Sequence, residues 1–178
     1  MSIDRLHFLE TLEDSYSAYY DIHKGGESES FGELPLIMRA DYYSRAERYW
    51  LSKKIPIWGN ETNEFCYIFS APAFDAQLAA KCIDLALADG LPRVKPHKEH
   101  QYTNIKVLLV ADSFDEPTVR YVQGRKFSKN YKLSLHGFTM LKAAAVDLDK
   151  QRAFPNAAGH ELSGYFKKLF AAEEKSKL

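Results

Sequence analysis

The chain has 178 residues, of which 46% are hydrophobic and 27% are charged. That balance is typical of a packed soluble protein and excludes a disordered or collagen-like chain. The 24 basic residues equal the 24 acidic ones, so the overall charge gives no reason to expect a nucleic acid, a membrane surface or a strongly charged substrate. The length predicts one globular domain over residues 1–178.

The cysteines and the N-terminus bear on where the protein works. Cys66 and Cys82 are too few for a disulfide framework and have no zinc-finger spacing around them, which favours reduced thiols. The N-terminus has no apolar signal region, and the chain has no apolar run long enough to span a membrane. We therefore expect a soluble cytoplasmic protein with no membrane partner.

Apolar periodicity and turn residues divide the first half of the chain into helices and strands. Apolar residues three and four apart indicate helices, and Gly, Pro and Asn mark the ends of elements. Ser2 suits a helix cap, Gly59-Asn60 suits a hairpin turn, and Gly90 suits a helix stop. The predicted elements are a helix over 2–20, a flexible loop over 25–30, a strand over 34–43, hairpin strands over 48–58 and 64–69, a helix over 72–90 and a surface loop over 91–103.

The second half begins with the clearest strand. Val107–Ala111 is a continuous apolar run, which indicates a strand covered on both faces. Ser113 or Asp115 can cap a short helix that follows, with Pro117 in its first turn and Gly124 at its end. The remaining predicted elements are a parallel strand over 131–135, a strand over 143–148, a helix that opens at Asn156 or Gly159 and buries Leu162, Phe166, Leu169 and Phe170, and a frayed tail over 173–178.

Together these elements predict an α/β (or α+β) fold. A mixed β-sheet would contain one hairpin and one β-α-β unit, with helices on both faces. Two pairs of passages, residues 43–49 with 61–64 and residues 145–149 with 156–159, resemble a family of small uncharacterised bacterial proteins. That resemblance implies a bacterial cytoplasmic setting and carries over no function.

The order of elements also resembles the core of PD-(D/E)xK nucleases, which runs helix, hairpin and third strand, helix, strand. That class needs an acidic residue on one strand and Glu-x-Lys on the next, so that two carboxylates hold a divalent ion. Glu64-Phe65-Cys66 has no lysine two residues on. The resemblance therefore implies, as the alternative function, a nucleic-acid-binding relative with a lost or rearranged metal site.

The preferred function is a binding or assembly module, homodimeric, for a small-molecule or protein ligand. Ligands bind beyond the carboxyl ends of parallel strands, which predicts a crevice lined by Asp112, Ser113 and His136. The alternative is that Asp112 and Ser113 only cap the next helix. A second predicted surface is the aromatic hairpin with Tyr43, Tyr49, Trp50 and Trp58.

Three further groups carry weaker signals, and the sequence holds no complete catalytic motif or cofactor motif. Basic residues that alternate with aromatic rings suit single-stranded nucleic acid, or else a solvated surface: Arg120, Arg125, Lys126, Lys129 and Lys132. Asp147 and Asp149 share one face of a strand and suit a divalent cation if Glu64 lies near them, or else a turn. His97-Lys98-Glu99-His100 is expected to be a solvated loop, because zinc needs more ligands.

Overall fold

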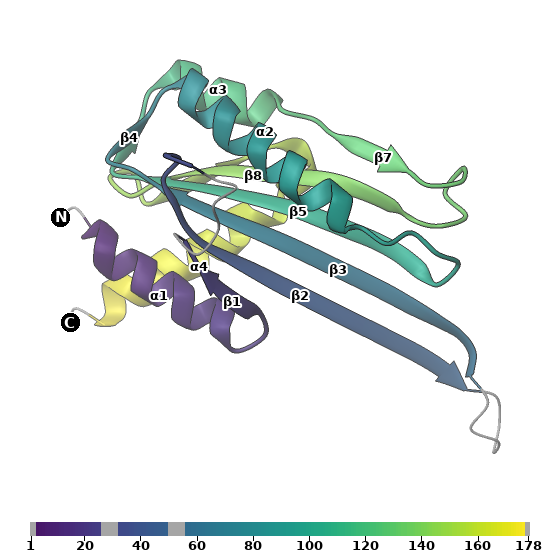
Figure 1. The fold of residues 1–178 in the computed structure, drawn as a ribbon. Helices are drawn as coiled ribbons and strands as arrows, with labels where there is room; N and C mark the ends of the chain where they lie inside the picture. The colour runs from purple at the N-terminus through teal and green to yellow at the C-terminus, as the bar shows by residue number, and fades with distance from the viewer. Residues whose placement is uncertain (1–2, 26–31, 50–55, 177–178) are drawn as a thin grey trace.

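A mixed seven-stranded sheet forms the centre of the computed structural model, which describes residues 3–25, 32–49 and 56–176 (Figure 1). Hydrogen-bonded neighbours follow the order β1-β2-β3-β5-β8-β7, and β9 pairs with β8. The strands are β1 (Asp21–Lys24), β2 (Leu36–Tyr49), β3 (Pro56–Ser70), β5 (His100–Ala111), β7 (Ser128–Asn130), β8 (Phe138–Asp147) and β9 (Arg152–Pro155), with a separate pair of β4 (Ala73–Phe74) and β6 (Ser113–Phe114).

Helices cover both faces of this sheet (Figure 1). They are α1 (Arg5–Ser17), α2 (Ala76–Arg93), α3 (Glu116–Gly124) and α4 (Glu161–Ser176), the last preceded by a 3₁₀ turn over Ala157–Gly159. Side chains alternate between the faces of a strand, so Tyr67 and Val107 pack in one core with α2 and α3 while Ile68 and Leu108 pack in a second core with α1 and α4. The predicted α/β fold with a mixed sheet and helices on both faces is confirmed.

The central strand is the one that its continuous apolar run predicts. β5 pairs in parallel with both β3 and β8. All five residues of Val107–Ala111 are 0% exposed, because helices lie over both faces and neither face needs polar side chains. The predicted β-α-β unit is formed by β5, α3 and β8.

Aspartates cap three of the helices. Asp4, Asp75 and Asp115 each accept a hydrogen bond from the backbone N–H three residues on, at 2.9, 2.7 and 2.8 Å. Each bond satisfies a donor that the first helical turn leaves unpaired. The α3 prediction is confirmed at Asp115, whereas α1 is capped by Asp4 and not by Ser2, which lies outside the described residues.

The predicted hairpin turn at Gly59-Asn60 is wrong. Gly59 lies inside β3 opposite Glu47, and Asn60 lies opposite Ala46. The strands join at residues 50–55, which lie outside the described residues. The long antiparallel ladder with β2 outweighs the local turn preference of the Gly-Asn dipeptide.

The predicted helix stop at Gly90 is also wrong, because α2 continues through Pro92 to Arg93. Gly90 is buried against the sheet, where a Cβ atom would lie 3.0 Å from Cδ1 of Ile105 and 3.2 Å from the hydroxyl of Tyr67. Glycine is needed here for the close approach of helix and sheet and not for a turn.

Residues 131–135 form a turn, although the pattern predicts a strand. Lys132, Leu133 and Ser134 have φ values of 46°, 54° and 70°, in the left-handed region, which no strand uses. The second parallel strand is β8, and the short strand β7 pairs antiparallel with its start. The surface loop predicted over 91–103 is shortened at both ends, by α2 and by β5.

The helices α1 and α4, which pack in the second core, bury the faces that their spacing predicts, with two exceptions in the helix predicted over 2–20. Leu6 of α1 is 71% exposed and Phe8 is buried instead, and Tyr19, which is 77% exposed, follows the end of α1. The first part of the tail predicted over 173–178 is the last turn of α4, where Glu173 is buried and accepts a hydrogen bond from the Thr11 hydroxyl. Within the described residues, no helix combines the length and apolar character needed to cross a membrane.

Candidate functional site

The predicted crevice lined by Asp112, Ser113 and His136 does not form. The backbone carbonyl of His136 accepts a hydrogen bond from His100, the first residue of β5, at 2.8 Å, whereas Asp112 follows the last residue of that strand. Because β5 and β8 are parallel, a residue before one and a residue after the other lie at opposite ends of the sheet. Asp112 instead forms an ion pair with Arg5 at 3.2 Å.

The acidic residues proposed for a metal site do not converge either. Asp147 pairs with Ala111 at the end of β5, whereas Glu64 pairs with Asn104 near its start. Asp147 is 0% exposed and accepts hydrogen bonds from the backbone N–H groups of Phe114 and Lys150. Across the described residues, no group of three or more His, Cys, Asp or Glu side chains is placed to hold a metal ion.

The basic residues of the nucleic-acid hypothesis do not share one element. They belong to α3, to its C-terminal end, to β7 and to the following turn: Arg120, Arg125, Lys126, Lys129 and Lys132. Arg120 forms an ion pair with Glu116 at 3.3 Å. Arg125 forms one with Asp84 at 2.5 Å. Two of the five cations are therefore offset by neighbouring carboxylates.

The aromatic residues of the β2–β3 hairpin point to different faces of the sheet. Tyr43 is 59% exposed and contacts Phe65 edge to face on the α2 side, with ring centroids 5.9 Å apart. Tyr42 points to the α1 side, where its ring lies 5.4 Å from that of Tyr20. Trp50 lies outside the described residues, as do the side chains of Tyr49 and Trp58.

The structure reveals a different cluster of functional groups, centred on an ion pair between Glu64 of β3 and Lys106 of β5. The Lys106 ammonium donates to Oε1 of Glu64, and the Tyr20 hydroxyl donates to the same oxygen. The two charged side chains are only 10% and 13% exposed, for Lys106 and Glu64 respectively. Removing two charged groups from water to this extent costs free energy. A buried ion pair of this kind is therefore a candidate functional site.

The surroundings of Lys106 and Tyr20 keep both of these groups protonated. Burial by itself lowers the pKa of Lys106. Electrostatic interactions with Cys66 and Glu64 raise it by more than burial lowers it, so the pKa lies above its usual value and the side chain stays an ammonium. Burial and then the Glu64 carboxylate raise the pKa of Tyr20, which therefore stays a hydrogen-bond donor. The site therefore presents the Lys106 ammonium and the neutral Tyr20 hydroxyl, which both donate to Glu64.

A second ion pair lies beside the first. Lys142 of β8 is in register with Lys106 and donates to Glu161 of α4 at 2.5 Å. Burial raises the pKa of Glu161, but the hydrogen bond and charge of Lys142, a backbone hydrogen bond and the nearby His160 together outweigh burial and leave that pKa below its usual value. Two cations and two anions therefore meet at this place, and their formal charges cancel.

The sheet next to these ion pairs is not covered by any described helix. Strands β2, β3 and β5 extend well beyond α1, as Figure 1 shows. We call this surface the open face; strand alternation and register assign to it Tyr42, Ser44, Thr62, Glu64, Tyr102, Asn104, Phe138 and Met140. It combines a stacked ring pair, Tyr102 and Phe138 with centroids 5.8 Å apart, with the polar side chains around Glu64.

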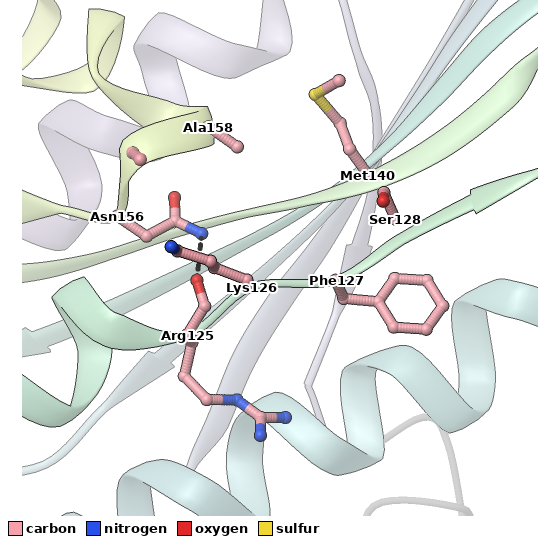
Figure 2. Close-up of a pocket in the computed structure, with 8 residues that line it drawn as sticks. Arg125, Lys126, Phe127, Ser128, Met140, Asn156 and Ala158 are labelled. Carbon is pink, nitrogen blue, oxygen red and sulfur yellow. Dashed lines mark hydrogen bonds between the residues drawn. The ribbon is translucent and has the colours of Figure 1, made fainter.

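A cavity of about 400 Å³ lies where the open face meets the 3₁₀ turn, between Met140, Phe127 and Ala158. Figure 2 shows that the guanidinium of Arg125 points away from this space. The amide of Asn156 is held by the backbone carbonyl of Arg125, to which it donates at 2.9 Å. The cavity is mostly apolar and adjoins the polar cluster through Met140.

The sequence contains one sign of this ion pair, which is Lys106. It interrupts the apolar stretch from Ile105 to Ala111, and a lysine inside a strand covered on both faces needs a carboxylate partner. Which carboxylate supplies it depends on the register between β3 and β5. That register is set by tertiary structure and could not be derived from the sequence.

The ion pair also bears on the nuclease resemblance. The described elements run α1, β1, β2, β3, β4, α2, β5, which, apart from the two-residue strand β4, follows the order helix, hairpin and third strand, helix, strand of that resemblance. Cys66 occupies the place of the lysine in Glu-x-Lys, and Lys106 lies opposite Cys66 in register. Among the described residues, neither in-register neighbour of Glu64 is a carboxylate, since they are Tyr42 on β2 and Asn104 on β5. Asp41 bonds to Arg93 on the other face.

Comparison with known proteins places the chain in one family. A family model described as a domain of unknown function (DUF8052) matches residues 4–168. No curated protein matches the chain, and no solved structure does. Because the match spans nearly all of the sequence, the chain belongs to the DUF8052 family, a family of unknown function.

Proposed function

We propose that this protein is a binding module and that its ligand site is the open face beside the Glu64–Lys106 pair. One observation carries the proposal: two nearly buried opposite charges and the Tyr20 hydroxyl lie next to a part of the sheet that no described helix covers. Polar groups of this kind next to apolar and aromatic surface are typical of small-molecule sites.

The charges favour a ligand without net charge. Lys106 is offset by Glu64 and Lys142 by Glu161, so a polyanion would gain little by electrostatic attraction. A zwitterion or a neutral polar molecule could use the same groups as donors and acceptors. The rings of Tyr20 and Tyr42 and the apolar cavity beside Met140 offer contacts to a flat apolar part.

A fragment screen by NMR tests this proposal. We expect zwitterionic and neutral aromatic fragments to shift the backbone amide signals of Glu64, Asn104 and Met140 in ¹⁵N-labelled protein. Tyr42→Ala should weaken binding at least tenfold, because the ring lines the face. Tyr43→Ala is the matched control and should leave binding unchanged, since that ring lies on the opposite face. Signals that move elsewhere, or a screen without hits, would contradict the proposal.

The alternative function, a nucleic-acid-binding relative of PD-(D/E)xK nucleases, is supported by the element order and by Glu64 with Lys106. It is weakened by the paired lysines and by the missing second carboxylate. Oligonucleotide titrations at two salt concentrations, with and without Mg²⁺, separate the two functions. Binding that weakens steeply with salt would favour the alternative; we expect neither such binding nor cleavage.

Self-association is a second candidate, favoured by the β7 edge of the sheet. Leu133 and Leu135, in the turn after β7, are 95% and 75% exposed. All three residues of β7 are exposed, and an uncovered edge with nearby apolar side chains can pair with another copy of the chain.

The two buried free cysteines further support a cytoplasmic setting, the one that the sequence resemblance implies for a bacterial protein.

Light scattering across a range of concentrations tests the dimer. The wild-type protein should approach twice the monomer mass as the concentration rises, and Leu133→Ser with Leu135→Ser should shift it toward the monomer. Leu6→Ser is the matched control, since Leu6 is 71% exposed but lies on α1. A monomer at every concentration, or equal effects of both sets of changes, would argue against this edge.

A further inference from the structure

An unpaired side-chain amide lies on the open face, next to the Glu64–Lys106 pair. Asn104 of β5 is in register with Glu64 on one side and with Met140 on the other, so these three side chains share one face of the sheet. Asn104 is only 6% exposed. Among the described residues, the structure gives its amide no hydrogen-bond partner. Buried amides nearly always have such a partner, so this amide is a candidate contact for a ligand.

The Glu64 carboxylate has one free oxygen beside this amide. The Lys106 ammonium and the Tyr20 hydroxyl both donate to Oε1, and no described residue donates to Oε2. The fully buried side-chain atoms that lack a hydrogen-bond partner belong to other residues, so Oε2 of Glu64 and the amide of Asn104 are both open to solvent. An amide has a C=O and an NH₂ group. The open face therefore offers an acceptor and a donor on neighbouring strands, about 4.8 Å apart.

Aromatic and apolar groups flank these two polar groups in the same row across the sheet. Tyr42 of β2 is in register with Glu64, and its ring centroid lies 5.4 Å from that of Tyr20. On the other side of the row, Met140 leads to the apolar cavity. The formal charges of the two ion pairs cancel, so neither a cation nor an anion is favoured. The row suits a flat uncharged ring that has a donor next to an acceptor on its edge.

We propose that the open face binds a flat, uncharged aromatic ring that contains a lactam, which is a ring N–H next to a ring C=O. The lactam N–H donates to Oε2 of Glu64, its C=O accepts from the Asn104 amide, and the ring packs against Tyr42. This inference rests on the proposed function and names the ligand class of that site. A ring without the N–H leaves the Glu64 oxygen unpaired, so the site should discriminate against the N-methylated ring.

NMR titration of ¹⁵N-labelled protein with matched pairs of lactams tests the inference. The probes are isoquinolone and hypoxanthine, and each counterpart has a methyl group in place of the lactam hydrogen. We expect at least one lactam to bind tenfold or more tightly than its counterpart and to shift the side-chain amide signals of Asn104. If other fragments bind the open face but neither lactam is preferred over its counterpart, the lactam inference is wrong and the proposed function stands. If nothing binds the open face, both are wrong.

Two asparagine variants locate the binding. Asn104→Leu should weaken lactam binding about tenfold, the effect of one lost hydrogen bond. Its unfolding temperature should equal or exceed that of the wild type, because the amide has no internal hydrogen bond to lose. Asn63→Leu is the matched control and should leave binding unchanged, since Asn63 precedes Glu64 in β3 and lies on the opposite face. Equal binding losses in both variants, or an Asn104→Leu variant that is less stable but binds normally, would overturn the inference.

Discussion

Replacing Glu64 with alanine is expected to lower the free energy of unfolding by about 3–5 kcal/mol, the range for removing one partner of a buried ion pair. The change would leave the Lys106 ammonium, 10% exposed, without its carboxylate. It would also remove the acceptor of the Tyr20 hydroxyl. Urea unfolding monitored by circular dichroism measures the effect.

The companion variants separate charge burial from simple loss of packing. Lys106→Met combined with Glu64→Leu removes both charges and should recover most of the lost stability, because apolar groups of similar size need no partner. Glu116→Ala is the control for an exposed pair and should cost about 0.5 kcal/mol or less. If Glu64→Ala cost no more than this control, the pair would not be buried in solution.

The parts of the fold that the sequence predicts are those that local physics decides. Val107–Ala111 is covered on both faces, and a run without polar residues has no other stable place in a soluble domain. Asp115, Pro117 and Gly124 together define a short helix through its cap, its first turn and its end. Each of these signals acts within a few residues and needs no knowledge of the rest of the chain.

The wrong predictions arise where tertiary packing overrides a local preference. Gly90 is a glycine because Ile105 and Tyr67 leave no room for a Cβ atom, although a glycine at that place also suits a helix end. Gly59 is compatible with a turn but lies in a strand, where it pairs with Glu47 of β2. In both cases the deciding neighbours are distant in sequence.

The sequence does not predict the candidate site, for the same reason. Glu64 and Lys106 lie on parallel strands joined by α2, and their meeting depends on the register between those strands. A register shift of one residue would have turned one of them to the other face. The prediction of a crevice is wrong for a simpler reason. His136 precedes β8 and Asp112 follows β5, and because these two strands are parallel the two residues lie at opposite ends of the sheet.

Asp147→Ala is expected to lower the free energy of unfolding by about 3 kcal/mol or more, because each buried donor left without a partner costs about 1–3 kcal/mol. Asp147 accepts from the backbone N–H groups of Phe114 at 3.1 Å and Lys150 at 2.8 Å, and from the Lys150 ammonium. It thus ties the end of β8 to β6 and to the turn that follows β8.

Asp149→Asn is the matched control for this change, since Asp149 is exposed, and it should change the free energy of unfolding by about 0.5 kcal/mol or less. Millimolar Mg²⁺ or Ca²⁺ should leave the unfolding midpoint of the wild-type protein unchanged, because both carboxylate oxygens of Asp147 already accept hydrogen bonds from these donors. A cation that stabilised the wild-type protein but not the Asp147→Ala variant would restore the metal hypothesis and overturn the structural role argued for Asp147.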